Sequence, residues 1–248
     1  MNRPFALLLA GHALSTCAFA EETHAPITQF YAGVSAGYDR IISKRTEKLE
    51  TGTGTKLSFS HNKTQTGNGF NGKLLGGFLW NIADTSFAIG PEIYAGYGSA
   101  EVTLQGTEHD PLGGPADKSY QSTFKQSFSM GIGLRAGFYL AENNDFVYIF
   151  GGIDRSKFEN KFTLSSTDVA GFPIPTLLAK NSKFLKSSVV GVGYERKIGS
   201  IKLSIDLRYS PYSAWKNYSR IAAVSNDKML LQFKPKIITT SLTVCYLF

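Results

Sequence analysis

The last twelve residues of the chain, Ile237 to Phe248, read IITTSLTVCYLF and decide the fold. Counted back from Phe248, every second position carries a larger or more apolar side chain: Tyr246, Val244, Leu242, Thr240 and Ile238. The positions between them are smaller and more polar in the middle of the stretch. This period of two predicts a β-strand with one side against an apolar medium and the other against small or polar groups. A closing strand of a soluble β-sandwich has the same alternation, so a lipid-facing strand and a sandwich strand both remain open at this point.

Composition favours one folded β-domain. The chain has 248 residues, of which 13% are aromatic and only 18% are charged, and this balance argues against disorder. The mean hydropathy is −0.10, and no apolar run reaches the length of about 18 residues expected of a membrane helix. Membrane-spanning strands need only about 9–11 residues each, and their polar alternate face lowers the average hydropathy. A membrane protein built from strands is therefore compatible with this composition.

The N-terminus has the pattern of a secretory signal peptide. Arg3 precedes an apolar core from Phe5 to Ala13, and Ala18-Phe19-Ala20 is an A-x-A cleavage site. A lipoprotein signal at Cys17 is the alternative, although the Thr before that cysteine makes a poor lipobox. Cleavage leaves Cys245 as the single cysteine, so no internal disulfide can form, and it changes the net charge from +7 to 7 − 1 = +6. We expect a cleaved signal peptide over residues 1–20 and one β-domain over residues 21–248.

Eight segments with period-two alternation follow one another along the mature chain, and the segment Gln126–Leu140 has the clearest pattern. The facing of the fifth segment is ambiguous, and Pro91 predicts a local irregularity in the third. Links of about four to six residues alternate with links of roughly 24 to 29 residues, which is typical of membrane barrels with short turns on one side and long loops on the other. The expected strands are Phe30–Arg40, Phe70–Trp80, Phe87–Ser99, Gln126–Leu140, Phe146–Lys157, Ser187–Arg196, Ile201–Ser210 and Ile237–Phe248.

The turn KIGS between the sixth and seventh segments tests which side chains of these two strands face the inside of the barrel. A four-residue connection places Glu195 opposite Lys202 and Arg196 opposite Ile201. Two residues assigned to the inner face thereby pair with opposite charge, which supports the assignment.

The whole mature chain resembles small eight-stranded outer-membrane proteins of the opacity type, similar to the barrel domain of outer-membrane protein A. The matching segments are FYAGVSAGY, FAIGPEIYAGYGS, SMGIGLRAGFYL, VVGVGYE, KLSIDLRYS and SLTVCYLF. The resemblance implies an all-β fold, an eight-stranded antiparallel up-and-down transmembrane β-barrel with short periplasmic turns and four long extracellular loops. It also implies location in the outer membrane of a Gram-negative bacterium. In this family the C-terminal strand acts as an insertion signal, which here falls on Val244, Tyr246 and Phe248.

Seven charged residues fall on the expected inner face. An eight-stranded barrel has an interior just wide enough for side chains, so we expect these residues to pair and fill it. The alternative is a narrow ion path that opens when the network rearranges, or a small porin. Glu92 and Arg135 are expected at similar depth. The expected interior charge network comprises Lys73, Glu92, Arg135, Glu195, Lys202, Asp206 and Arg208.

No catalytic, cofactor or metal site is expected. Barrels that hydrolyse lipids or peptides need a nucleophile beside a histidine base, and none of the four histidines lies on an expected strand. His61 and His109 could meet as a metal site, but a lone loop histidine is usually solvated. The chain is therefore expected not to be an enzyme.

The long loops carry most of the net positive charge and one apolar stretch, residues 169–178. The apolar stretch is a candidate contact site, or it folds back on the barrel rim. Expected partners are outer-membrane lipid and lipopolysaccharide, the barrel-assembly machinery through the C-terminal strand, and a host or matrix ligand, but no nucleic acid. We expect a surface protein that acts in envelope structure and adhesion. The candidate loop contacts are Lys44, Arg45, Lys48, Phe172, Ile174 and Leu177.

Overall fold

The computed structural model describes residues 28–50, 63–82, 85–108, 118–140, 144–167, 173–220 and 228–248, and these residues form strands and the turns between them. In these ranges no helix is long and apolar enough to span a membrane. The expected signal peptide lies outside them. The ten strands are β1 (Thr28–Glu50), β2 (Lys63–Asn81), β3 (Phe87–Gly98), β4 (Glu101–Glu108), β5 (Lys118–Leu140), β6 (Asp145–Thr167), β7 (Pro173–Ile198), β8 (Ile201–Pro211), β9 (Trp215–Arg220) and β10 (Lys228–Leu247).

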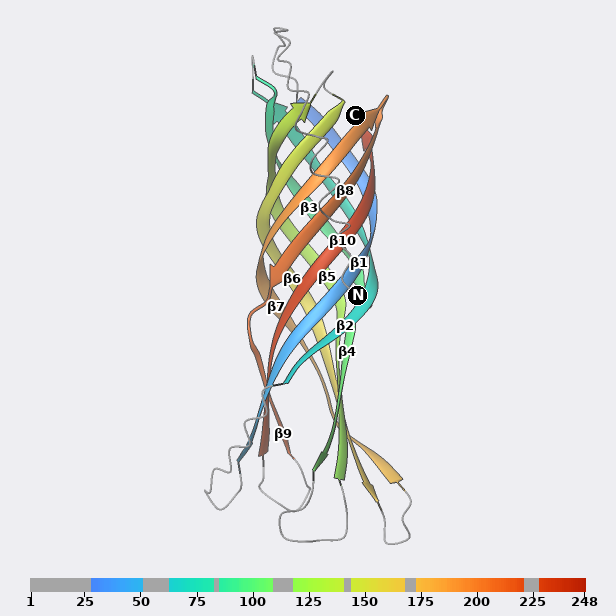
Figure 1. Cartoon of the computed structure of the whole chain (residues 1–248), viewed down its shortest axis with the longest axis vertical. Coiled ribbons are helices and arrows are strands. Elements are labelled where there is room, and N and C mark those ends of the chain that lie inside the picture. Colours follow the sequence, from blue (N-terminus) through green and yellow to red (C-terminus); the bar gives the residue numbers. More distant parts are fainter. Residues whose placement is uncertain are drawn as a thin grey trace, which may run out of the picture.

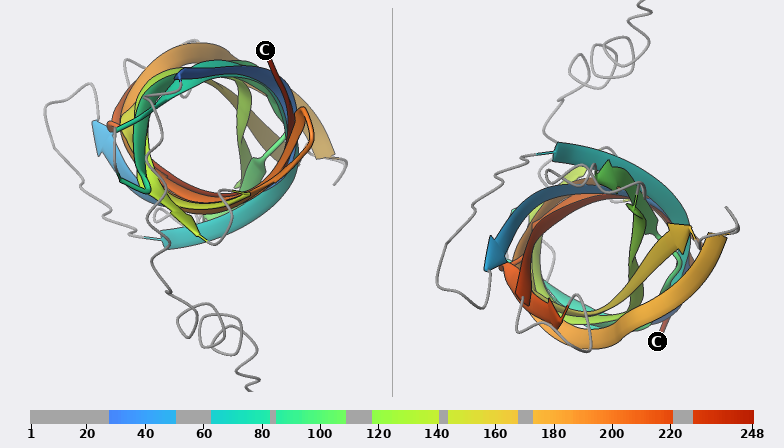
Figure 2. Two further views of the ribbon diagram at one scale, coloured as in Figure 1. Left: turned by 90° about the horizontal axis from the view of Figure 1, so that it is seen from above. Right: turned by 90° about the horizontal axis from the view of Figure 1, so that it is seen from below.

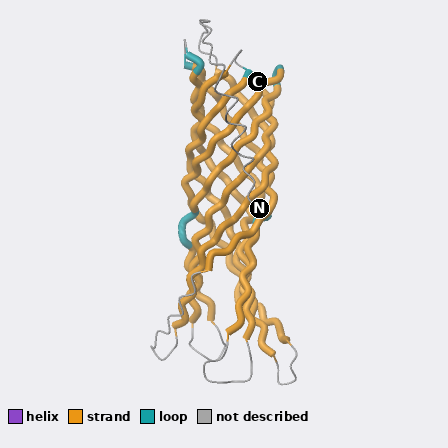
Figure 3. The backbone as a smooth tube through the Cα atoms, in the orientation of Figure 1, coloured by secondary structure: helices purple, strands orange, loops and turns teal. Residues whose placement is uncertain are grey.

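Eight of these strands close into a barrel (Figures 2 and 3). All pairings are antiparallel, and the order around the ring is β1-β10-β8-β7-β6-β5-β3-β2, with β2 returning to β1. The ring closes between the first and last strands, whose pairing runs from Tyr31↔Leu247 to Glu50↔Lys228. The short strands β4 and β9 follow β3 and β8 in the chain and pair with β5 and β10. The fold class predicted from the sequence is confirmed.

The barrel wall is apolar outside and mixed inside. Large side chains such as Phe70, Leu74 and Ile153 are exposed on the outer surface, by 73%, 68% and 65% respectively. Aromatic pairs mark the two borders of this apolar band. Near the short turns these are Phe30–Phe78, Phe87–Phe138 and Tyr246–Phe248, and near the opposite border Tyr38–Phe70 and Tyr97–Phe128, with ring centroids 5.1–5.7 Å apart. A band with an aromatic girdle at each border is typical of barrels that cross a bilayer. We call the two borders the turn end and the loop end.

The fifth ring strand, β6, has an unambiguous facing in the structure. Phe146, Tyr148, Phe150 and Asp154 are buried inside, whereas Ile149 is exposed outside. The sequence could not settle this because aromatic residues occupy inner as well as outer positions. The irregularity expected in the third strand is present, since the pairing of β2 with β3 is interrupted between Gly77↔Glu92 and Trp80↔Ile89, beside Pro91.

The strands continue well past the loop-end border, which corrects the expected boundaries. Much of what the sequence analysis assigned to long loops is strand: Lys44, Arg45 and Lys48 lie in β1, and Ile174 and Leu177 lie in β7. The reason is the backbone ladder, because β1 stays paired with β10 as far as Glu50. The expected strand boundaries were placed where the apolar alternation ends. Strands can remain paired beyond that point, because backbone hydrogen bonds do not require apolar side chains. Phe172 lies outside the described residues.

At the loop end the closed ring separates into two sheets. Beyond the barrel, β2 and β4 pair only at Asn68↔Glu101. On the other side, β7 pairs with β8 only as far as Val190↔Tyr209, followed by a single bridge, Ser187↔Tyr212. We call β4-β5-β6-β7 the first loop-end sheet and β9-β10-β1-β2 the second. Figure 1 shows the strands converging below the barrel and then separating.

The two loop-end sheets pack through an aromatic core. Phe124 of β5 stacks on Phe158 of β6 and on Phe233 of β10, with centroids 5.0 and 4.9 Å apart, and its ring lies 5.8 Å from that of Trp215 in β9. The contacts with Phe233 and Trp215 join one sheet to the other. The loop end is thus held by a buried apolar core of its own, as in a small β-sandwich. The loop-end core comprises Ile41, Ala100, Val102, Phe124, Phe158, Phe162, Leu185, Tyr212, Trp215, Phe233 and Ile237.

The turn between β7 and β8 is tighter than expected, and the predicted register was wrong. Lys197 pairs with Lys202 and Glu195 with Ser204, a shift of two residues. Only Gly199 and Ser200 connect the strands, and Gly199 has a φ of 62°, which glycine adopts without steric cost. A shift of two keeps every side chain on its predicted face, so Glu195 and Lys202 still meet, as described below.

Inner glycines make room for the large interior rings. Substitution of Gly193 should therefore destabilise the barrel more than substitution of Gly151. A methyl group at Gly193 would overlap the ring of Tyr148, whereas nothing lies within 4 Å of one at Gly151. We expect Gly193→Ala to lower the free energy of unfolding by about 1–3 kcal/mol, as overpacking does, and Gly151→Ala to change it by less than about 0.5 kcal/mol. Urea unfolding in detergent micelles, followed by tryptophan fluorescence, measures both. Equal effects would contradict this packing.

Candidate functional site

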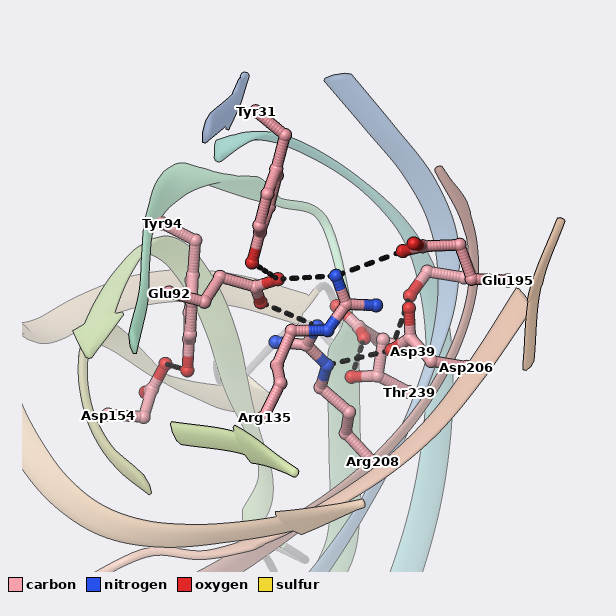
Figure 4. A network of polar contacts seen from close by, with 11 residues as sticks. Tyr31, Asp39, Glu92, Tyr94, Arg135, Asp154, Glu195, Asp206, Arg208 and Thr239 are labelled. Atoms are coloured by element: carbon pink, nitrogen blue, oxygen red, sulfur yellow. Dashed lines mark hydrogen bonds and ion pairs between the residues drawn. The ribbon is translucent and has the colours of Figure 1, made fainter. Parts of the chain in front are cut away.

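The centre of the barrel holds a chain of ion pairs, which we call the lumen network. Arg135 of β5 lies between two carboxylates, with Nη1 3.5 Å from Glu92 Oε2 and 3.1 Å from Glu195 Oε2. Lys202 Nζ lies 2.8 Å from Glu195 Oε1. At the other end, Arg208 contacts Glu92 Oε1 at 2.9 Å and Asp206 Oδ1 at 2.7 Å. Six of the seven charged residues singled out in the sequence are thus brought together from β3, β5, β7 and β8. Figure 4 labels five of them: Glu92, Arg135, Glu195, Asp206 and Arg208.

The side chains of the lumen network are buried. None of its six side chains is more than 8% exposed. The guanidinium carbon of Arg135 lies 3.8 Å from the centroid of the Tyr148 ring, and that of Arg208 lies 4.2 Å from Phe150. Three cations and three carboxylates balance in charge, which lowers the cost of removing them from water. The network therefore fills the lumen and ties together strands on different sides of the ring.

Lys73 is the seventh residue, and it stands apart. Its ammonium group lies 5.2 Å from the centroid of the Tyr94 ring, a cation–π distance. In the described part of the chain it forms none of the ion pairs within 4.0 Å. It lies on the inner face but is only partly buried.

A second polar cluster was missed from the sequence. The Asp154 carboxylate accepts hydrogen bonds from Tyr94 at 3.0 Å and from Tyr212 at 2.6 Å, as well as from Ser156 at 2.7 Å. Nearby, the Asp39 carboxylate accepts a hydrogen bond from Thr239. Asp39 is buried in the barrel but was not included in the expected network. Asp154 was missed because the facing of the fifth strand was undecided.

A second buried cluster lines the barrel and is interleaved with these polar groups. Its Tyr148 and Phe150 rings pack on Arg135 and Arg208, and the hydroxyl of its Tyr31 donates to Glu92 Oε2 at 3.3 Å. The cluster comprises Tyr31, Leu75, Leu79, Ala88, Tyr94, Phe146, Tyr148, Phe150, Val189 and Cys245. Apolar rings and ion pairs thus fill the barrel together.

The remaining predicted residues fall on the outer surface or outside the described ranges. Val244, Tyr246 and Phe248 all face outwards, and Phe248 is 79% exposed. Lys44 is exposed on β1. The four histidines lie outside the described residues, so the histidine-based expectations stay predictions. Within the described residues, no group of three or more His, Cys, Asp or Glu side chains is arranged to hold a metal ion.

Comparison with known proteins gives a likeness of fold. No protein-family model and no curated protein matches the sequence. Among solved structures, the chain is similar to the outer membrane protein OprG from Pseudomonas aeruginosa, with 11% identity over 89% of this chain and 96% of that one and a TM-score of 0.50. It also matches the outer membrane protease OmpT from Escherichia coli (13% identity, 92% and 99% covered, TM-score 0.45). A third match is Ail, the attachment invasion locus protein of Yersinia pestis (11%, 88% and 98%, 0.35). The shared feature is the outer-membrane type of β-barrel.

Proposed function

We propose that this chain, whose fold is that of outer-membrane β-barrels, is an integral outer-membrane protein that acts in envelope structure and in surface interaction through its loop end. One observation carries the proposal: the outer surface is an apolar band between two aromatic girdles, while the lumen is filled by side chains. An apolar exterior favours lipid as the surrounding medium. A filled interior favours a structural barrel over a solute pore.

The loop end is the part of the molecule suited to binding. Lys44, Arg45 and Lys48 extend along β1 beyond the apolar band, and Ile174 and Leu177 lie at the start of β7. The two packed loop-end sheets carry these segments beyond the apolar band. The partners we propose are lipopolysaccharide, a host or matrix ligand at the loop end, and the assembly machinery at the outward-facing Val244, Tyr246 and Phe248. Catalysis is not part of the proposal.

A narrow ion channel is the alternative function, and the lumen network argues against it. Because none of the six network side chains is more than 8% exposed, an ion could pass only after these residues separate. Their separation would leave buried charges without partners, which is costly.

Two measurements test the proposal. The mature chain, refolded in detergent, should migrate differently with and without heating and should resist protease outside the loops; a protein soluble without detergent and lacking this shift would contradict the membrane assignment. Replacing Lys44, Arg45 and Lys48 together by glutamine should weaken attachment of the reconstituted protein to sulfated glycan surfaces at least about tenfold, since the attraction between cations and sulfate groups dominates such contacts. This triple variant should still migrate differently with and without heating, a difference that we call the heat shift. Unchanged attachment would contradict the role of this segment.

A further inference from the structure

Two cations face each other on the outer surface of the first loop-end sheet. Arg155 of β6 pairs in register with Lys186 of β7, and both side chains are exposed. Like charges directly opposite one another across an antiparallel pair destabilise the sheet. A counter-charge from outside the chain would relieve this repulsion.

The neighbours of this pair supply no counter-charge. Along the two strands the next outward residues are Ile153 and Lys157 on β6, and Phe184 and Ser188 on β7. Across the β5 side, Arg155 is opposite Met130. On the other edge, the Lys186 carbonyl accepts a hydrogen bond from the Ser213 amide at 2.9 Å. None of these neighbours is acidic.

A nearby row of the same sheet shows the opposite arrangement. Lys125 of β5 is paired with Glu101 on one side and with Glu159 on the other. Lys157 also lies 3.7 Å from Glu159. Lys125 and Lys157 therefore both have a carboxylate beside them within the sheet and need no external anion. A second like-charged pair, Lys161↔Lys180, lies six residues further along β6, so Arg155 and Lys186 are distinguished by lying next to the exposed Ile153 of the apolar band.

The position of the pair matches the headgroup level of a membrane. Arg155 is two residues beyond Ile153, whose exposed side chain belongs to the apolar band. Two strand residues advance about 7 Å along the chain. The charged groups therefore follow directly on the last lipid-facing side chains, where the phosphates of a lipid leaflet lie.

Arg155 is also held in place. Its guanidinium carbon lies 5.0 Å from the centroid of the Phe184 ring, which is in the next cross-strand row. A guanidinium group packed on a ring loses less side-chain freedom on binding, and its fork of donors matches the geometry of phosphate oxygens. Lys186 adds a second positive charge beside it.

We propose that Arg155 and Lys186 form a clamp for a phosphate group of an anionic lipid, a phosphorylated glycolipid in the leaflet at the loop end. The inference rests on the proposed membrane location and adds the residues and the chemistry of the lipid contact. The clamp makes a charge-assisted bond to the phosphate from each strand, while the lipid chains lie on Ile153, Met130 and Val190, which are exposed below it.

The test is a lipid titration of the full mature barrel in uncharged detergent micelles. The probe is diphosphoryl lipid A, with dephosphorylated lipid A and inorganic phosphate as comparison ligands. The double variant Arg155→Gln/Lys186→Gln is compared with Lys161→Gln/Lys180→Gln, which removes the same charge from the like-charged pair further from the apolar band. We expect the first variant to bind the diphosphoryl lipid at least about tenfold more weakly, the equivalent of about 1.4 kcal/mol. The second is expected to change binding less than about threefold. Wild type should bind neither comparison ligand as tightly.

Each other outcome overturns the clamp. Equal weakening in the two double variants would mean general charge attraction, and no weakening in either would mean that the lipid does not touch this site. Binding of inorganic phosphate as tight as that of the lipid would assign the site to a free anion. Arg155→Lys, which keeps the charge but loses the fork, should weaken binding less than Arg155→Gln and serves if the double variant fails to fold. Loss of the heat shift in the wild-type protein would instead refute the membrane location itself.

Discussion

Replacing Arg135 by methionine is expected to lower the free energy of unfolding of the barrel by about 3–5 kcal/mol, the range found when one member of a buried ion pair is removed. Methionine has a similar length but leaves Glu92 and Glu195 without the cation between them. It also removes the contact of the guanidinium with the Tyr148 ring. Urea unfolding of the refolded protein in micelles measures the difference.

The control for this prediction is Arg196→Met at the turn end. Arg196 is 63% exposed and lies 3.9 Å from Asp145, so its loss should cost no more than about 1 kcal/mol. In planar bilayers the wild-type barrel is expected to stay closed, whereas Arg135→Met should show occasional conducting events. An Arg135→Met barrel as stable as wild type would mean that the lumen network does not brace the ring.

Replacing Phe124 by alanine is expected to loosen the loop end while the barrel remains folded. A buried phenylalanine contributes about 3–5 kcal/mol, including the cavity that its loss leaves. Phe124 contacts both Phe233 and Trp215 of the opposite sheet, so these sheets lose their central contact. We expect faster amide exchange and faster proteolysis beyond the apolar band, with an unchanged heat shift. In a Trp80→Phe background, the emission of Trp215 should move to longer wavelength.

Phe184→Ala is the matched control. Phe184 belongs to the same sheet but is 40% exposed on its outer surface, so its removal should leave exchange and Trp215 emission nearly unchanged. Global loss of the heat shift in Phe124→Ala would show that the loop-end core and the barrel unfold as one unit, which would contradict the expectation of local loosening.

The fold was predictable because lipid on the outside imposes a period of two that is visible in single strands. The inner positions of Glu92, Arg135 and Glu195 followed from the same alternation. Strand ends were not predictable from it, because beyond the bilayer both faces of a strand meet water or another sheet. Lys44 and Leu177 were therefore expected in loops, although each lies in a strand.

The candidate site was predictable as a set of residues but not as a set of contacts. The pairing of carboxylates with cations depends on the register between neighbouring strands. The predicted register at the β7–β8 turn was wrong by two residues, so the residues of a turn define the register only weakly. The inner position of Asp154 could be predicted only if the facing of β6 was known. In β6, Gly151 and Gly152 interrupt the alternation of apolar and polar residues. The aromatic core around Phe124 joins strands distant in the sequence, so no local pattern could indicate it.

The pairing of β1 with β10 has a consequence for how the protein is made. The Asp39–Thr239 contact joins residues 200 positions apart, so the largest loop in the chain closes only when the final strand arrives. Contacts of such high sequence separation form slowly, because chain entropy is lost before they form. Until then β1 has an unpaired edge able to pair with another chain. A newly made chain is therefore exposed to pairing with its neighbours at this edge until β10 arrives.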